Sequence, residues 1–245
     1  MAHLIDQQQI REALSLAGLS YVEDLNPNLA AQLSIWLSGM LNAPRNLTAI
    51  REPEAAIHKH VIEPLAGRHR LIGADLPVPH GPMIDIGSGN GAPGLPFALC
   101  EPERASTLLD SRTGAADFLS EIVALLDAPH IGVLRERAEL AAHTEVREGF
   151  SLAISRAVAP PATALELMVP FLQVGGIAAA WTGELSLAEK HLAAQTAHEL
   201  GAEITPIDPP EDILVATKIR PTNSRYPRSW NQMRRRPLSP SRIRD

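Results

Sequence analysis

The chain has 245 residues, of which 45% are hydrophobic and 20% charged, and its formal net charge is −6. This composition excludes a wholly disordered chain and predicts a globular α/β protein with one main domain. The single cysteine, Cys100, excludes an intramolecular disulfide, and no apolar stretch reaches the ~20 residues that a membrane span needs. Residues 1–6 lack the charged and apolar regions of a secretory signal. The sequence therefore favours a monomeric cytoplasmic protein that makes no membrane contact.

The first 72 residues are predicted to form an N-terminal helical extension. Apolar side chains recur there at the spacing of one helical face, and Glu52-Pro53 is typical of the start of a further helix that runs to about Gly67. The longest apolar face comprises Leu29, Leu33, Trp36, Leu37 and Met40. We interpret Trp36 and Met40 as core residues for this reason. Proline and glycine cluster from Gly73 to Pro82, which predicts a boundary after residue 72.

Strand and helix patterns alternate over residues 73–219. Short apolar strands are expected at 83–86, 107–110, 131–134, 152–155 and 176–181, with amphipathic helices between most of them. Repeated βα units predict a Rossmann-like, mostly parallel sheet that is covered on both faces. Residues 204–207 and 213–219 are joined by so short a link that we expect an antiparallel pair, so the last strand should run against the others.

The most informative segment is a glycine loop that follows the first of these strands, with the sequence Asp85-Ile86-Gly87-Ser88-Gly89-Asn90-Gly91-Ala92-Pro93-Gly94. Such a loop, at the carboxyl edge of a parallel sheet, brings bare backbone against a ligand. Its last three glycines fit the dinucleotide pattern, but Asp85 would repel a pyrophosphate and can pair with the ammonium of a methionine moiety. Asp110, at the end of the next strand, is placed to bind ribose hydroxyls. Together these features favour S-adenosylmethionine over a nicotinamide cofactor.

The charge is divided unevenly along the chain. Residues 218–245 hold nine basic side chains against Asp245 alone, for a local charge of +8, and the preceding 217 residues hold 13 basic and 27 acidic side chains, for −14. An acidic body with a basic end is typical of a protein with a polyanionic partner. We expect residues 220–245 to be a basic tail that binds RNA through its arginines, Tyr226 and Trp230. Its removal should leave cofactor binding nearly unchanged; the alternative is a disordered end that only adds solubility.

In this order the motifs resemble one family, the bacterial small-subunit (16S) ribosomal RNA guanine-N7 methyltransferases, also called glucose-inhibited division protein B. The resemblance covers most of the chain. It runs through Asn46-Leu47-Thr48 with Arg51, the glycine loop with Leu95-Pro96, Leu108-Leu109-Asp110-Ser111, Ile154-Ser155-Arg156-Ala157, Arg225-Tyr226-Pro227-Arg228 and Arg236-Pro237-Leu238. It implies a class I methyltransferase fold, S-adenosylmethionine as the cofactor, and 16S rRNA or a precursor of the small ribosomal subunit as the partner.

The resemblance also implies which residues bind the cofactor, and it makes Arg156 the candidate catalytic residue, through contact with the cofactor or a target phosphate. With the residues that the glycine loop and Asp110 suggest directly, the predicted cofactor site comprises Asp85, Gly87, Gly89, Ala92, Asp110, Ala138, Glu139 and Arg156. The sequence departs from the family pattern at Glu63-Pro64, at Gly114-Ala115 and at Thr182. These positions concern the substrate side more than the cofactor loop.

The expected chemistry needs little from the protein's own side chains. Guanine N7 carries a lone pair and can attack the sulfonium methyl without losing a proton, so no general base is assigned and catalysis should depend on positioning and electrostatics. His58 and His60 do not form a metal-ligand pattern, and no metal is expected. Two alternatives stay open: a methyltransferase of the same fold that acts on another RNA position, a small molecule or a protein, and an RNA-binding protein without turnover.

Overall fold

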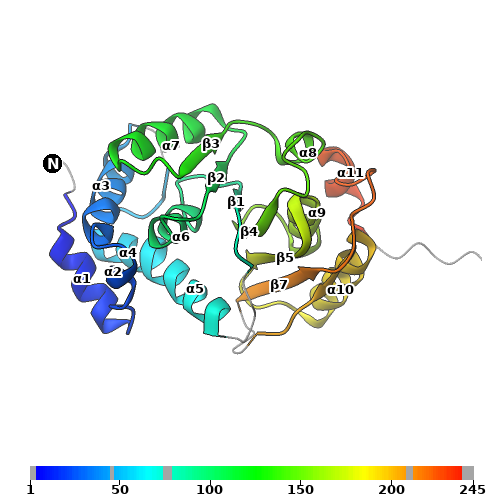
Figure 1. Ribbon diagram of the computed structural model, residues 1–245, viewed down its shortest axis with the longest axis horizontal. Helices are drawn as coiled ribbons and strands as arrows, with labels where there is room; N and C mark the ends of the chain where they lie inside the picture. The colour runs from blue at the N-terminus through cyan, green and yellow to red at the C-terminus, as the bar shows by residue number, and fades with distance from the viewer. Residues whose placement is uncertain (1–3, 45–46, 74–78, 208–211, 239–245) are drawn as a thin grey trace, which may run out of the picture.

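A computed structural model describes residues 4–44, 47–73, 79–207 and 212–238 of the chain. At its centre lies a seven-stranded sheet with the strand order β3-β2-β1-β4-β5-β7-β6 (Figure 1). Strands β1 to β5 pair in parallel, β7 runs antiparallel to β5, and β6 runs antiparallel to β7. The strands are β1 (Met83–Ile86), β2 (Ser106–Leu109), β3 (Ile131–Leu134), β4 (Phe150–Arg156), β5 (Leu172–Trp181), β6 (Ala202–Ile204) and β7 (Ile213–Lys218). The predicted Rossmann-like fold class, with its antiparallel last strand, is confirmed.

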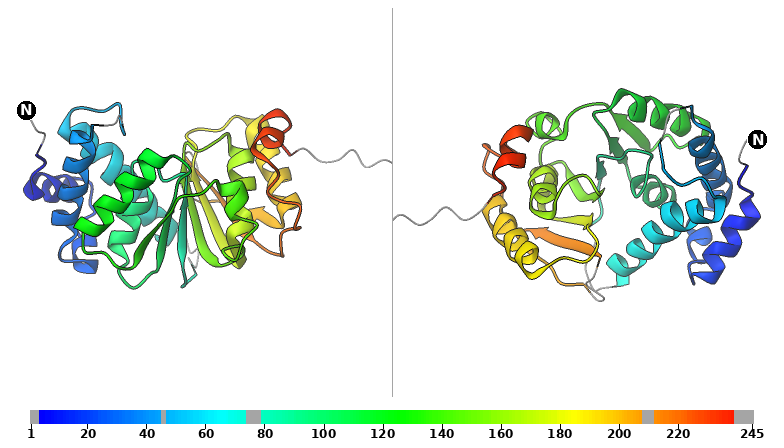
Figure 2. Two further views of the ribbon diagram at one scale, coloured as in Figure 1. Left: turned by 90° about the horizontal axis from the view of Figure 1, so that it is seen from above. Right: turned by 180° about the vertical axis from the view of Figure 1, so that it is seen from behind.

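Helices cover both faces of the sheet, and the strands show why. In β1, Ile84 and Ile86 join the core on one face, whereas Met83 joins the core on the other, as the two-residue period of a strand requires. Figure 2 shows the N-terminal helices on one side of the sheet and the C-terminal helices on the other. The helices within the sheet region are α6 (Gly94–Cys100), α7 (Thr113–Leu125), α8 (Ala138–Ala141), α9 (Pro161–Met168), η2 (Val169–Phe171), α10 (Leu187–Leu200) and α11 (Trp230–Arg235).

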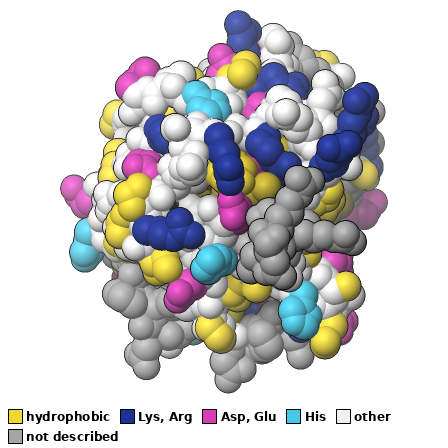
Figure 3. Space-filling view, turned by 90° about the vertical axis from the view of Figure 1, so that its right-hand side faces the viewer, with side chains coloured by type: hydrophobic (Ala, Val, Ile, Leu, Met, Phe, Trp, Pro, Cys, Tyr) yellow, Lys and Arg dark blue, Asp and Glu magenta, His cyan; other side chains and the backbone are white. Residues whose placement is uncertain are grey.

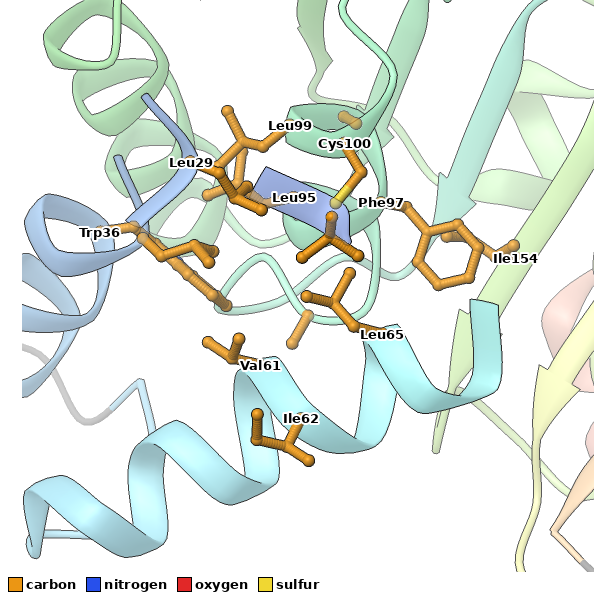
Figure 4. Packing of buried hydrophobic residues seen from close by; sticks show 14 of the residues in the cluster. Leu29, Trp36, Val61, Ile62, Leu65, Leu95, Phe97, Leu99, Cys100 and Ile154 are labelled. Carbon is orange, nitrogen blue, oxygen red and sulfur yellow. The ribbon is translucent and has the colours of Figure 1, made fainter. Parts of the chain in front are cut away.

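The N-terminal extension is helical as predicted, and it packs directly against the sheet region. Trp36, the expected core residue, is fully buried. Figure 4 shows it among Leu29, Val61 and Leu65 from the extension and Leu95 from α6. The elements of the extension are α1 (Gln7–Leu16), α2 (Val22–Leu25), α3 (Leu29–Asn42), α4 (Pro53–Ile57), η1 (His58–Ile62) and α5 (Glu63–Gly73). The helix expected to end near Gly67 therefore continues to Gly73, through a π-helical turn at η1.

The C-terminal segment departs most from expectation. Residues 220–238 pack against the domain, and Tyr226, Met233 and Leu238 belong to the same hydrophobic core as α9 and α10. Residues 220–238 are therefore packed into the domain, because these buried side chains complete its core. That their removal leaves cofactor binding nearly unchanged stays a prediction. The last part of the predicted tail, residues 239–245, lies outside the described residues, as do Arg242 and Arg244. The N-terminal extension shares one buried core with the sheet region, and residues 220–238 share another. The division at residues 72 and 219 stays a prediction from the sequence.

Candidate active site

A cavity of about 570 Å³ opens at the carboxyl ends of β1, β2 and β4, a size typical of small-molecule sites. The parallel register of these strands brings segments far apart in the sequence to one edge of the sheet. All but one of the predicted site residues line this cavity, and Asp85 is the exception. The predicted residues that line it are Gly87, Gly89, Ala92, Asp110, Ala138, Glu139 and Arg156.

The glycine loop forms one wall of the cavity, and Gly87 shows why glycine is needed there. Its φ is +74°, in the left-handed region that side chains disfavour, and a Cβ atom would lie 2.7 Å from Cγ2 of Val158. The loop is also held from behind, because Nε1 of Trp36 donates a hydrogen bond to the carbonyl oxygen of Asn90 at 2.8 Å. The N-terminal extension thus fixes the loop that forms the cavity wall.

Asp85 lies beneath the loop and is fully buried. Its Oδ2 accepts a hydrogen bond from the backbone N–H of Gly94 at 3.1 Å, at the start of α6, whereas Oδ1 has no hydrogen-bond partner among the described residues. A Cβ atom on Gly94 would collide with this carboxylate. Burial raises the pKa of Asp85 to about 7, and the nearby Ser88 side chain and the hydrogen bond from Gly94 oppose that rise. Asp85 therefore supports the loop from below, and its buried Oδ1 lacks the partner that such an oxygen normally has.

Asp110 faces the cavity just after β2. Its Oδ2 accepts a hydrogen bond from the N–H of Gly89 and its Oδ1 accepts one from the N–H of Arg112, both at 2.8 Å. Since a carboxylate offers about four lone-pair sites, both oxygens can accept further donors such as a pair of ribose hydroxyls. The guanidinium of Arg112 lies 3.3 Å from Oδ1, and its side chain is 71% exposed.

Ala138 and Glu139 line the cavity at the start of α8. The Glu139 carboxylate is buried and accepts a hydrogen bond from Nε of Arg137 at 2.7 Å. Glu139 is therefore a held, buried group, whereas its residue type alone would suggest an ordinary solvated carboxylate. Its position at the cavity agrees with its place among the predicted cofactor-site residues.

Arg156 ends β4 and is oriented by η1. One Nη atom donates to the carbonyl oxygen of Lys59 at 2.7 Å, and the other lies 3.0 Å from Nδ1 of His60. Burial and the neighbouring Arg156 lower the pKa of His60 to about 4, so the ring is neutral near pH 7 and Nδ1 can accept this hydrogen bond. Nε2 of His60 then carries the proton and donates to Oγ1 of Thr48, 3.1 Å away. Arg156 is thus positioned by hydrogen bonds rather than by an ion pair.

Three contributors to the site were not recognised from the sequence as parts of one arrangement. The sequence excludes His60 only as a metal ligand, and the structure places it in contact with Arg156. Trp36 was assigned to the core, but it also supports the glycine loop. Trp230, from the predicted tail, lines the cavity. Of these three residues, only Trp230 has a sequence pattern that suggests a binding role, because it is an aromatic residue among arginines.

The five positions that depart from the family pattern lie outside the cavity lining. Glu63 pairs with Lys59 on the surface of the N-terminal helices, and Pro64 and Ala115 are buried in α5 and α7. Gly114 lies at the start of α7, and Thr182 follows β5. Within the described ranges, no helix is long and apolar enough to cross a membrane, and no group of three or more histidine, cysteine, aspartate or glutamate side chains could hold a metal ion.

The chain is similar in sequence to one family of known proteins. A sequence profile described as rRNA small subunit methyltransferase G matches residues 31–207. The chain belongs to this family. Proteins named ribosomal RNA small subunit methyltransferase G are 33% identical in Chloroflexus aggregans, over 84% of this chain and 86% of that relative, and 34% identical in Thermotoga neapolitana, over 83% and 89%.

The rRNA small subunit methyltransferase G family assignment agrees with the fold. A solved structure of a proposed S-adenosyl-L-methionine-dependent methyltransferase from Methanococcus maripaludis aligns with a TM-score of 0.50 at 16% identity, over 64% of this chain and 85% of that chain. At this identity the likeness shows the fold alone. The family assignment confirms the prediction of a methyltransferase that depends on S-adenosylmethionine.

Proposed function

We propose that the protein transfers the methyl group of S-adenosylmethionine to N7 of a guanine in 16S ribosomal RNA. The observation that carries the proposal is the cavity itself, in which a carboxylate held by two backbone N–H groups (Asp110) and a positioned guanidinium (Arg156) face the same space beside a glycine loop. The family and the names of the relatives supply the substrate class. Ribosomal RNA as a substrate implies the cytoplasm as the place of action, and we propose that the protein acts there as a monomer.

The residues of the cavity fit the cofactor. Asp110 would accept hydrogen bonds from the two ribose hydroxyls, because its backbone donors leave lone pairs open toward the cavity. Gly87, Gly89 and Ala92 would bring bare backbone against the amino-acid part, and Ala138 with Glu139 would border the adenine. Asp85 would stabilise the ammonium from beneath the loop through its unpartnered Oδ1.

The chemistry that we propose needs no base. The cofactor supplies an electrophilic methyl group, and guanine N7 supplies a lone pair that is already free. The protein's task is then to hold the ring in line with the methyl group and to exclude other orientations. Arg156 is suited to this task, since arginine readily donates to O6 of guanine or to a phosphate. His60 cannot serve as a base toward the substrate, because its Nδ1 already accepts from Arg156.

The RNA would approach over the face that carries α11. In Figure 3, lysine and arginine side chains gather over the upper half of this face. Within α11 and just after it, Arg234, Arg235 and Arg236 are exposed, and no described acidic side chain pairs with them. Arg112 and Arg137 lie exposed at the cavity. Such side chains bind the phosphate backbone without reading its sequence.

The test is tritium transfer from labelled cofactor to ribosomal RNA from a strain that lacks this protein, followed by nucleoside mapping. The proposal predicts one labelled 7-methylguanosine in the small-subunit RNA, and an Arg156→Ala variant with a much lower turnover and an unchanged nucleoside product. Label at another base or atom would refute the guanine-N7 assignment in favour of a methyltransferase with a different target. Cofactor binding without any transfer would favour the non-catalytic alternative.

A further inference from the structure

Trp230 is the aromatic side chain through which the C-terminal segment reaches the cavity. It begins α11 and lines the cavity with Leu167 of α9 and Val158 of the loop after β4. Its position is set by strong anchors on both sides. Arg228, two residues earlier, forms an ion pair with the buried Glu166, and Met233, three residues later, is fully buried.

Tyr226 shows that the position of Trp230 is specific. Both aromatic residues stand among arginines, and the sequence suggests the same stacking role for each. In the structure Tyr226 is only 4% exposed, and its hydroxyl donates a hydrogen bond to Glu199 at 2.8 Å. Tyr226 is therefore part of the packing, whereas Trp230 is partly buried against the core and also borders the cavity.

We propose that Trp230 is a stacking surface for a purine ring bound in this cavity. Leu167 and Val158 line the same cavity and, like Trp230, belong to or pack against one hydrophobic cluster. An apolar, aromatic surface of this kind suits the flat face of a base better than a phosphate or a ribose. Two purine rings could stack on Trp230: the adenine of the cofactor and the target base of the RNA. Stacking of the target base rests on the proposed function, whereas stacking of the adenine requires only that the cofactor binds.

The test compares Trp230→Leu, which keeps an apolar side chain without an aromatic face, with Trp230→Phe, which keeps a smaller aromatic face. Asn231→Ala, at an exposed neighbouring position of α11, is the matched control. Two quantities are measured on the full chain: the Kd for S-adenosylhomocysteine by calorimetry, and the KM for small-subunit ribosomal RNA. Loss of one stacking partner should weaken the affected quantity about tenfold, with substantial recovery in Trp230→Phe and no change in Asn231→Ala.

The outcomes separate the two sources. A raised Kd for S-adenosylhomocysteine assigns the stacked ring to the cofactor, and a raised KM for RNA at unchanged Kd assigns it to the target base. Both values within twofold of the unchanged protein, in a folded Trp230→Leu variant, would overturn the proposal. If ribosomal RNA is not methylated at all while the Kd responds, the proposed function fails and the stacking role stands.

Tryptophan fluorescence gives a second test of the stacking role, which does not require the Trp230→Leu variant to fold. The emission of the unchanged protein minus that of Trp230→Phe isolates Trp230 from the buried Trp36 and Trp181. A change in this difference on addition of S-adenosylhomocysteine, or of guanosine monophosphate to that complex, is the expected result. No change with either probe would overturn the proposal.

Discussion

The glycine loop and the C-terminal segment (residues 220–238) both stand out in the sequence as binding regions, yet they use their residues differently. The loop presents backbone to the cavity, and its function depends on where the chain turns. The sequence predicts that the C-terminal segment presents positive side chains, but Arg225 and Arg228 pair with acidic side chains of the domain, as does Lys218 at the end of β7. A backbone motif keeps its role in most surroundings, whereas the role of a long charged side chain depends on what lies opposite it.

The ion pairs of the C-terminal segment also differ among themselves. Glu166 is 1% exposed and accepts hydrogen bonds from the backbone and side chain of Arg228, with the closest contact at 2.6 Å. The side chains of Arg225 and Glu199 are 63% and 39% exposed. Exposed pairs contribute about 0–1 kcal/mol, whereas a buried carboxylate that loses its partner is far more costly. Arg228 is therefore primarily a structural residue, despite its place in a basic sequence.

The largest effect is expected for Gly87→Ala. The new Cβ atom would meet Val158 and would sit on a left-handed backbone, so the loop must move and detectable binding of S-adenosylhomocysteine should be lost in calorimetry. Gly183→Ala is the matched control, because its φ is +71° but nothing lies within 4 Å of the added atom. The control should lose about 1–2 kcal/mol of stability from backbone strain and keep its affinity. Normal binding by Gly87→Ala would show that the loop is not part of the cofactor site.

Arg228→Ala should destabilise the protein by about 3–5 kcal/mol, because it leaves the Glu166 carboxylate buried without a counter-charge. Chemical denaturation measures this change in the free energy of unfolding. Arg225→Ala should leave it nearly unchanged, because this side chain is exposed and its ion pair is screened by solvent. If both variants lost equally little free energy of unfolding, the C-terminal segment would be a loosely attached basic tail.

The pH dependence of cofactor binding tests Asp85. Its pKa of about 7 in the free protein means that it is largely protonated at pH 6. If it pairs with the cofactor's ammonium, binding lowers this pKa and releases a proton, so affinity for S-adenosylhomocysteine should rise about tenfold from pH 6 to pH 8. Asp85→Asn keeps an acceptor for Gly94 but cannot ionise, so its affinity should stay flat over this range. If the affinity of the unchanged protein did not change between pH 6 and pH 8, Asp85 would not pair with the ammonium, and its role would be the hydrogen bond with Gly94 alone.

The smallest effect is expected for single replacements of Arg234, Arg235 or Arg236 by alanine. Each should leave stability within about 0.5 kcal/mol, since these side chains are exposed. If one of them contacts a phosphate, the slope of log affinity for RNA against log salt should decrease by about 1. If this slope were unchanged in all three variants, RNA would not bind at α11. A truncation after Leu238 tests whether residues 239–245 contribute to RNA affinity, because it keeps the buried Tyr226, Met233 and Leu238.

The sequence by itself determined the local patterns of this protein. Strand spacing predicted the parallel sheet with its antiparallel end, and the glycine loop with Asp110 predicted the cofactor and the edge of the sheet at which the cavity opens. These features are readable because they depend on backbone conformation and on periods of two or 3.6 residues, which neighbouring residues set.

Only the tertiary structure decided which polar groups face the cavity and which are held by partners. Arg156 meets His60 across 96 positions of sequence, Arg228 meets Glu166 across 62, and Trp36 meets Asn90 across 54. Nothing local to these residues specifies such contacts, because they follow from how the helices pack on the sheet. The same packing buries Tyr226 and turns Trp230 to the cavity, so two aromatic residues four positions apart have different surroundings.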